Sequence, residues 1–189
     1  MRYRHVILDR DGVLNREAAA AGYIRDAAAF EWLAGAREGL AALRRARVRI
    51  SIATNQSGVG RGLMTAGELE AVHARMLAEA AASGGALDAV FVCAHAPEAG
   101  CDCRKPAPGL IVAALAAGGV SAAETLVVGD DARDLEAAAR AGVAAALVRT
   151  GKGRQTEARL SGARVSTYDD LWALAQAITA SAPDALETP

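Results

Sequence analysis

Short apolar runs alternate along the chain with longer segments in which apolar residues recur at helical spacing. The short runs are rich in β-branched residues and are predicted to be strands, at residues 5–8, 48–53, 90–93, 125–129 and 144–148. The longer segments are predicted to be helices, at residues 36–46, 65–83, 108–117, 132–141 and 169–180. Strands that alternate with helices favour an α/β fold with a doubly wound, mainly parallel, Rossmann-like sheet.

A single domain accounts for this pattern. No internal repeat or linker divides residues 1–180, and residues 181–189 are expected to form a frayed tail. The stretch from Tyr23 to Phe30 is poorly patterned and too short for a large cap domain. The apolar run before Asp9 is too short for a signal peptide, and no run is long enough to span a membrane, so a cytoplasmic protein is expected.

The charge balance argues against partners that need a strongly charged surface. The 189 residues carry a formal net charge of -1, and charged residues are spread along the chain. Binding to nucleic acid through bulk charge and anchoring to a membrane through a basic patch are therefore both disfavoured. We expect a monomer that acts on a small molecule.

Polar residues lie at the ends of four of the predicted strands: Asp9, Thr54, Cys93 and Asp130. Ligands of an open α/β sheet bind beyond the carboxyl ends of its strands, so these residues are predicted to share one rim. Asp9 and Asp11 are two residues apart and can face one site, one as a nucleophile and the other as a proton carrier. Alone, an Asp-x-Asp-Gly string is as typical of a calcium-type loop or an acidic turn as it is of a catalytic site.

The loop after the second predicted strand is rich in glycine. It reads Thr54-Asn55-Gln56-Ser57-Gly58-Val59-Gly60-Arg61-Gly62, and its hydroxyl and successive amides are predicted to form a nest for an anion. It matches neither the Walker A run nor the dinucleotide-binding fingerprint. An ordinary polar loop is the alternative interpretation.

Three cysteines and one histidine cluster after the third predicted strand. Cys93, His95, Cys101 and Cys103 form a Cys3His set, the composition of a closed structural zinc site. All cysteines of the chain belong to this set, which makes unliganded thiols the weaker alternative. Four protein ligands leave no open position, so Zn²⁺ is predicted to stabilise the loop and not to take part in chemistry.

Charged residues follow the zinc loop and the fourth predicted strand. Arg104 and Lys105 come directly after the last cysteine, and a lysine fixed near carboxylates can neutralise the charge of a phosphate. Asp130 brings another carboxylate to the rim. With Asp9 it forms an oxygen-rich site of the kind that Mg²⁺ prefers.

Four other polar residues have simpler explanations. Asp131 and Asp134 could cap the helix that follows them. His5 lies on a predicted strand and His73 on a predicted helix, without metal-binding neighbours in the sequence. Both histidines are expected to be ordinary packed side chains.

A nucleophile pair, a hydroxyl, a lysine and a second acidic site, each after its own strand, resemble the four motifs of the haloacid dehalogenase superfamily of phosphotransferases. The resemblance extends from Val6 to Gly153. It implies a phosphatase in which Asp9 forms an aspartyl-phosphate and Asp11 acts first as acid and then as base. The implied phosphate ligands are Thr54 and Lys105, and the implied Mg²⁺ ligands are Asp9, the carbonyl of Asp11, and Asp130.

Within this superfamily the zinc loop is similar to two groups, the heptose 1,7-bisphosphate 7-phosphatases and the histidinol-phosphate phosphatases. Residues 9–15 with Gly22-Tyr23, residues 54–62 and residues 148–153 resemble the heptose group. That resemblance implies removal of the 7-phosphate of a sugar bisphosphate in nucleotide-activated heptose and lipopolysaccharide biosynthesis. The implied substrate-binding residues are Gly22, Tyr23, Asn55, Gln56, Ser57 and Arg104.

The chain departs from the heptose group at three places. The run Glu17–Ala21 is longer and richer in alanine, position 131 is Asp where lysine is frequent, and the zinc loop is short, with five residues between His95 and Cys101. Three alternatives stay open: a histidinol-phosphate phosphatase, a phosphatase for another sugar bisphosphate, and a non-catalytic zinc-loop binding module. The preferred anomer of the sugar depends on the shape of the pocket.

Overall fold

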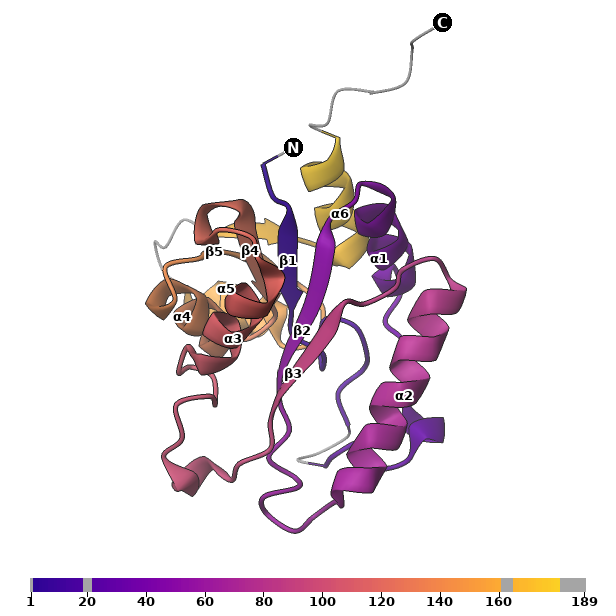
Figure 1. Cartoon of the computed structure of the whole chain (residues 1–189), viewed down its shortest axis with the longest axis vertical. Helices are drawn as coiled ribbons and strands as arrows, with labels where there is room; N and C mark the ends of the chain where they lie inside the picture. The colour runs from indigo at the N-terminus through magenta and orange to yellow at the C-terminus, as the bar shows by residue number, and fades with distance from the viewer. Residues whose placement is uncertain (1, 19–21, 161–164, 181–189) are drawn as a thin grey trace, which may run out of the picture.

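The computed structural model describes residues 2–18, 22–160 and 165–180. Its centre is a six-stranded sheet in which all neighbours pair in parallel, in the order β3-β2-β1-β4-β5-β6 (Figure 1). The strands are β1 (His5–Leu8), β2 (Arg49–Asn55), β3 (Ala89–Cys93), β4 (Thr125–Gly129), β5 (Ala144–Val148) and β6 (Ser166–Tyr168). The order changes direction between β1 and β4, which is where open sheets of this kind bind ligands.

Helices cover both faces of the sheet (Figure 1). The α-helices are α1 (Ala36–Arg45), α2 (Ala66–Ala82), α3 (Gly109–Gly118), α4 (Ala132–Arg140), α5 (Gly153–Arg159) and α6 (Leu171–Thr179). The described residues also form the short 3-10 helices η1 (Ala27–Ala29), η2 (Pro97–Ala99) and η3 (Ala122–Glu124). Among the described residues, no helix is long and apolar enough to cross a membrane.

Strand β1 shows how the sequence fixes the two layers. Val6 and Leu8 pack in the core that includes residues of α1, α2 and α6, whereas Ile7 packs in the core that includes residues of α3 and α4. Successive side chains of a strand point to opposite faces of the sheet, and all three are fully buried. A strand buried on both faces reads as an uninterrupted apolar run, as this one does.

The predicted doubly wound α/β fold is confirmed, and no large cap domain interrupts the described residues. All predicted strands and helices occur, with bounds that agree within two residues. Helix α5 and strand β6 were not predicted, because α5 is short and mostly polar and β6 is an edge strand of three residues. The predicted tail at 181–189 lies outside the described residues, and the domain bounds 1–180 remain a prediction.

His5 on β1 is a histidine whose surroundings disfavour protonation. It is fully buried, its Nε2 lies 2.9 Å from Ser51 Oγ, and burial together with the charge of Arg49 lowers its pKa to about 4. A lowered histidine pKa adds stability above the ordinary value of about 6.5, and this stability is lost as the pH falls toward 4. Acidification from pH 7 to pH 4 lowers the unfolding free energy of the wild type. In His5→Gln this drop is expected to be smaller by about 2–3 kcal/mol.

Urea unfolding of both proteins at the two pH values measures this difference. Parallel losses in wild type and variant would show that His5 does not contribute to the acid sensitivity of the fold.

Candidate active site

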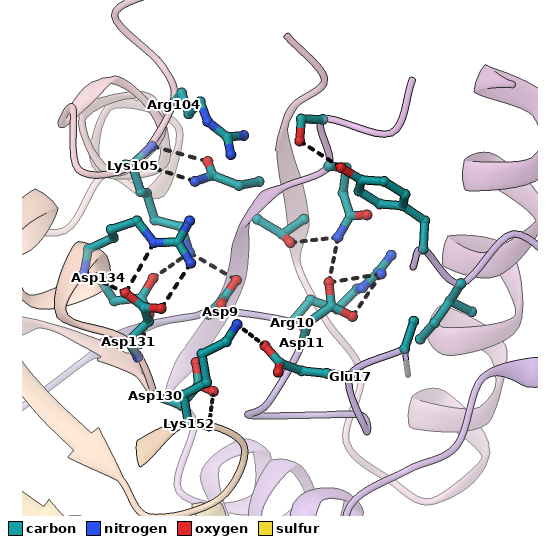
Figure 2. A pocket seen from close by; sticks show the side chains of 18 of the residues that line it. Asp9, Arg10, Asp11, Glu17, Arg104, Lys105, Asp130, Asp131, Asp134 and Lys152 are labelled. Atoms are coloured by element: carbon teal, nitrogen blue, oxygen red, sulfur yellow. Dashed lines mark hydrogen bonds and ion pairs between the residues drawn. The ribbon is translucent and has the colours of Figure 1, made fainter. Parts of the chain in front are cut away.

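A pocket of about 580 Å³ opens at the carboxyl ends of the central strands (Figure 2). Every residue predicted to act in catalysis, substrate binding or Mg²⁺ binding lines it. These residues are Asp9, Asp11, Gly22, Tyr23, Thr54, Asn55, Gln56, Ser57, Arg104, Lys105 and Asp130. Strand pairing explains the convergence, since β1 lies between β2 and β4. The structure brings the predicted set together, and the role of each residue remains a prediction.

Asp9, which follows β1, faces a buried lysine. Lys105 Nζ lies 2.9 Å from Asp9 Oδ1 and 2.5 Å from Asp134 Oδ1, and it donates to the carbonyl of Ala53 at 2.7 Å. Lys105 and Asp134 are both buried. Three acceptors engage all three protons of the ammonium group, so the lysine is fixed beside Asp9. A phosphate placed at Asp9 would therefore meet a cation that is already oriented.

The cluster of carboxylates around Asp9 suits a divalent cation. Asp9, Asp130 and Asp134 offer carboxylate oxygens that all lie within 4.8 Å of one another. Burial, opposed by Lys105 and reinforced by Asp134 and Asp11, raises the pKa of Asp9 to about 6. Burial and the nearby Asp9 raise the pKa of Asp130 to about 8. A cation between these groups would offset their repulsion, and a donor set made only of oxygen fits Mg²⁺.

Two glycines allow the backbone to approach Asp130 closely. A Cβ atom on Gly12 would lie 2.0 Å from Asp130 Oδ2, and one on Gly151 would lie 2.1 Å from the same atom. Both have positive φ, 84° and 53°, which glycine adopts readily. The amide of Lys152 donates to Asp130 Oδ2 at 2.7 Å, and Thr156 Oγ1 donates to its carbonyl at 2.8 Å. The segment after β5 thus orients Asp130, a contact that no local sequence pattern predicts.

Asp134 belongs to the site although its sequence context explains it as a helix cap. It accepts from the amide of Asp131 at 3.2 Å and completes a capping box at the start of α4, so the capping prediction is confirmed. The same carboxylate contacts Lys105 and lies in the cluster with Asp9. Gly129 permits this position, because a Cβ there would lie 2.2 Å from that of Asp134. One side chain therefore serves both the helix and the pocket.

Replacing Asp134 with asparagine is expected to lower kcat by about 100-fold, whereas Asp131→Asn should lower it less than about threefold. At either position, asparagine keeps a side-chain oxygen that can accept the same backbone hydrogen bond. Only Asp134→Asn removes a charge that faces Lys105, since Asp131 pairs instead with Arg133 at 2.9 Å. Phosphate release at saturating substrate and Mg²⁺ measures both variants, and equal effects would contradict the assignment of Asp134 to the site.

Asp11 is held by three side chains, and Figure 2 shows its paired contact with Arg10. Arg10 Nη2 donates to its two oxygens at 2.9 and 3.0 Å, Asn15 Nδ2 donates at 2.9 Å, and Gln56 Nε2 donates at 2.7 Å. Gln56 also donates to Thr54 Oγ1 at 3.0 Å. Burial alone would raise the pKa of Asp11, but the charge of Arg10 and these hydrogen bonds hold it below its ordinary value. Asp11 is therefore an ionised, oriented carboxylate in the free protein.

The loop after β2 positions other residues, and several of its amides are not available for the predicted anion nest. The amides of Gln56, Gly60 and Arg61 donate to protein carbonyls at 2.8, 2.9 and 3.0 Å. The nest prediction is wrong for these amides, because the turn closes on itself and on the segment after β3. Asn55 clamps Lys105: its Nδ2 donates to the carbonyl of Lys105 at 3.0 Å, and its Oδ1 accepts from the amide of Lys105 at 3.1 Å.

Aromatic and basic side chains line one side of the pocket. Tyr23 Oη lies 3.1 Å from Ser57 Oγ and accepts from Arg61 Nη1 at 3.3 Å. Arg104 lines the same pocket. The hydrogen bond with Ser57 lowers the pKa of Tyr23 most, and the charges of Arg61 and Arg104 lower it further. Gly58 is needed here, since a Cβ would lie 2.8 Å from the Tyr23 ring. This side of the pocket therefore places the charges of Arg61 and Arg104 near the phenol of Tyr23.

Two further cations, which the sequence did not single out, line the pocket beside the carboxylates. Arg133 is held by Asp131, with Nε–Oδ1 at 3.1 Å and Nη2–Oδ2 at 2.9 Å. Lys152 pairs with Glu17 (Figure 2). Asp131 stands where lysine is frequent, and Arg133 and Lys152 each pair with an acidic side chain on this side of the pocket. The alanines at 19–21, part of the divergent run after Glu17, lie outside the described residues.

The four predicted zinc ligands converge in the loop that begins at the end of β3. The Sγ atoms of Cys93 and Cys101 are 3.6 Å apart, those of Cys101 and Cys103 are 3.5 Å apart, and His95 Nδ1 lies 3.2 Å from Cys103 Sγ. A tetrahedron with Zn–S bonds of about 2.3 Å has edges of roughly 3.7 Å, so the set fits a closed zinc site. Lys105 follows two residues after Cys103, so the metal would fix the segment that places the lysine.

Comparisons with known proteins identify relatives that cover almost the whole chain. A family model described as HAD-hydrolase-like matches residues 102–174. The D-glycero-beta-D-manno-heptose-1,7-bisphosphate 7-phosphatase of Bordetella bronchiseptica is 43% identical over 176 residues, covering 90% of this chain and 95% of that protein. The D-glycero-alpha-D-manno-heptose-1,7-bisphosphate 7-phosphatase of Mycobacterium tuberculosis is 39% identical over 179 residues, covering 92% of this chain and 90% of that protein.

A solved structure is also similar over nearly its full length. The crystal structure of the D,D-heptose 1,7-bisphosphate phosphatase of B. bronchiseptica, complexed with magnesium and phosphate, superposes with a TM-score of 0.89. The two chains are 39% identical, and the match covers 95% of this chain and 99% of that one.

Proposed function

Because the chain belongs to the family of heptose-1,7-bisphosphate 7-phosphatases among the HAD-like hydrolases, we propose that it removes the 7-phosphate of D-glycero-D-manno-heptose 1,7-bisphosphate. The products are heptose 1-phosphate and inorganic phosphate, on the route to nucleotide-activated heptose. One observation carries the proposal: Asp9 lies 2.9 Å from the buried ammonium group of Lys105, inside a pocket lined by further cations.

In the proposed first step, an oxygen of Asp9 attacks the phosphorus of the 7-phosphate. The bond between phosphorus and the sugar 7-oxygen breaks, and Asp11 gives its proton to that oxygen. The bound phosphate dianion makes Asp11 available as an acid, because a neighbouring negative charge raises the pKa of a carboxylate. The step leaves heptose 1-phosphate and an aspartyl-phosphate on Asp9.

In the proposed second step, water attacks the phosphorus of the aspartyl-phosphate. Asp11 takes a proton from the water, the bond between phosphorus and Asp9 breaks, and inorganic phosphate leaves. Lys105 and Thr54 hold the non-bridging oxygens in both steps. Uncatalysed hydrolysis of phosphate monoesters is among the slowest known reactions, so fixed positive charge and positioning must provide most of the acceleration.

The carboxylate cluster is the proposed Mg²⁺ site. Asp9, Asp130 and the carbonyl of Asp11 would hold the ion, with Asp134 beside them. When bound, the ion supplies positive charge to the phosphate oxygens. Without it, the raised pKa values of Asp9 and Asp130 leave part of the cluster protonated near neutral pH.

The second phosphate of the substrate would bind on the side of Tyr23. Arg61 and Arg104 lie there, and guanidinium groups bind phosphate through paired hydrogen bonds. We place the enzyme in the cytoplasm, since phosphorylated sugars do not cross membranes freely. A monomer is the proposed active form.

Parallel assays on heptose 1,7-bisphosphate and histidinol phosphate test the substrate. We expect kcat/KM to be at least about 100-fold higher for the bisphosphate, because histidinol phosphate has no second phosphate for the arginines. Both anomers belong in the assay, since relatives are named for each. An equal or reversed preference would favour the histidinol alternative, and absence of Mg²⁺-dependent activity on any sugar phosphate would favour a zinc-loop binding module.

A further inference from the structure

Arg10 is a fully buried arginine with few partners. Its side chain is 1% exposed, and it heads the set of the largest fully buried side chains. Nη2 donates to both oxygens of Asp11, and Nη1 lies 3.1 Å from His73 Nε2. Among the described residues, Arg10 Nε has no hydrogen-bond partner. Asp11 and His73 are therefore the two groups that fix the plane of this guanidinium.

His73 must be the acceptor in its contact with Arg10. An arginine can only donate, so His73 Nε2 offers its lone pair and the ring proton resides on Nδ1. Burial and the charge of Arg10 lower the pKa of His73 to about 4, so the ring is neutral near pH 7. Helix α2 presents His73 on the same face as the buried residues Leu69 and Met76, which are four residues before and three residues after it. The acceptor is thus anchored to the core.

We propose that His73 is a positioning residue for catalysis: it fixes Arg10, and through Arg10 it orients the carboxylate of Asp11. The inference rests on the proposed function, in which Asp11 protonates the leaving sugar oxygen. It goes beyond the expectation that His73 is an ordinary packed side chain. The guanidinium is held at both ends, and removal of one end leaves a buried donor without an acceptor. Arg10 would then turn, and Asp11 would lose the paired contact that sets its orientation.

Two variants at position 73 separate the acceptor from the packing. In His73→Gln, the side-chain oxygen can reach the position of Nε2 and accept from Arg10. In His73→Leu, the volume and helix propensity are retained and the acceptor is lost. We expect kcat/KM on the sugar bisphosphate to fall by about tenfold to a hundredfold in His73→Leu, the range found when a residue that orients a catalytic group is removed. His73→Gln should stay within about threefold of wild type.

A second substrate shows whether the defect acts through Asp11. With p-nitrophenyl phosphate the leaving phenolate departs without needing a proton, so the acid matters little in the step that kcat/KM reports. We expect His73→Leu to lose less than about threefold in kcat/KM on this ester. Equal losses on both substrates would overturn the proposal, and so would equal activity of the Leu and Gln variants on the sugar substrate.

A crystal structure of His73→Leu tests the geometry independently of any reaction. Arg10 should have moved away from its paired contact with Asp11, while His73→Gln keeps it. An unmoved Arg10 in His73→Leu would overturn the proposal even if the wild type is active. A wild type that fails to hydrolyse the sugar bisphosphate contradicts the proposed function instead, because these structures still report on the contact.

Discussion

Replacing Asp9 with asparagine is expected to lower kcat by at least about 10⁴-fold while the protein stays folded. The amide has nearly the same shape as the carboxylate but cannot attack phosphorus. Folding should tolerate the change, because burial raises the pKa of Asp9 and makes its charge costly in the free protein. Lys105 keeps its contacts with Asp134 and the carbonyl of Ala53. Phosphate release and thermal unfolding measure the two halves of this prediction.

Asp169→Asn is a matched control for the same chemical change. Asp169 is an exposed carboxylate that pairs with Arg149 and does not line the pocket. Its replacement should leave kcat within about twofold of wild type. Turnover by Asp9→Asn at a rate close to that of the control would exclude Asp9 as the nucleophile.

Removal of zinc is expected to lower the melting temperature by at least about 10 °C. Structural zinc contributes on the order of 10 kcal/mol in small metal modules. Even half of that value would shift Tm by roughly 10–20 °C in a chain of this size. The loop that Cys93, His95, Cys101 and Cys103 enclose leads directly to Lys105, so activity should fall along with stability. Calorimetry before and after chelation, with Mg²⁺ restored, measures the effect.

The variant Cys103→Ser controls for unrelated effects of the chelator. It should already have a lowered melting temperature, and chelation should lower it little further. A wild-type melting temperature that is unchanged after verified loss of zinc would rule out the structural role of the metal.

The sheet and the position of the pocket could be predicted from the sequence because both depend on local patterns. Short, β-branched apolar runs such as 125–129 are typical of strands buried on both faces, and each ends at a polar residue. Parallel strands place all their carboxyl ends at one edge, so Asp9, Thr54 and Asp130 converge whatever the details of packing. The zinc ligands were predictable because all four lie close together in the sequence, within one short loop.

Contacts that depend on tertiary packing could not be predicted in this way. Asp134 looks like a cap, and only the approach of Lys105 across the sheet shows its second role. His73 lies 63 residues from Arg10 in the sequence, and nothing local to either residue indicates their contact. Lys152 enters the pocket because the chain turns back at Gly151 against Asp130. In each case the two contacting segments are far apart in the sequence, and no local pattern of residues relates them.

The central claim is that this chain removes the 7-phosphate of a heptose bisphosphate, and ³¹P NMR of a single reaction tests it most directly. With purified protein and Mg²⁺, the signal of the 7-phosphate should be replaced by that of inorganic phosphate while the signal of the 1-phosphate persists. Asp9→Asn should leave both signals unchanged. Loss of the 1-phosphate signal first, or no release of phosphate from either anomer, would contradict the claim.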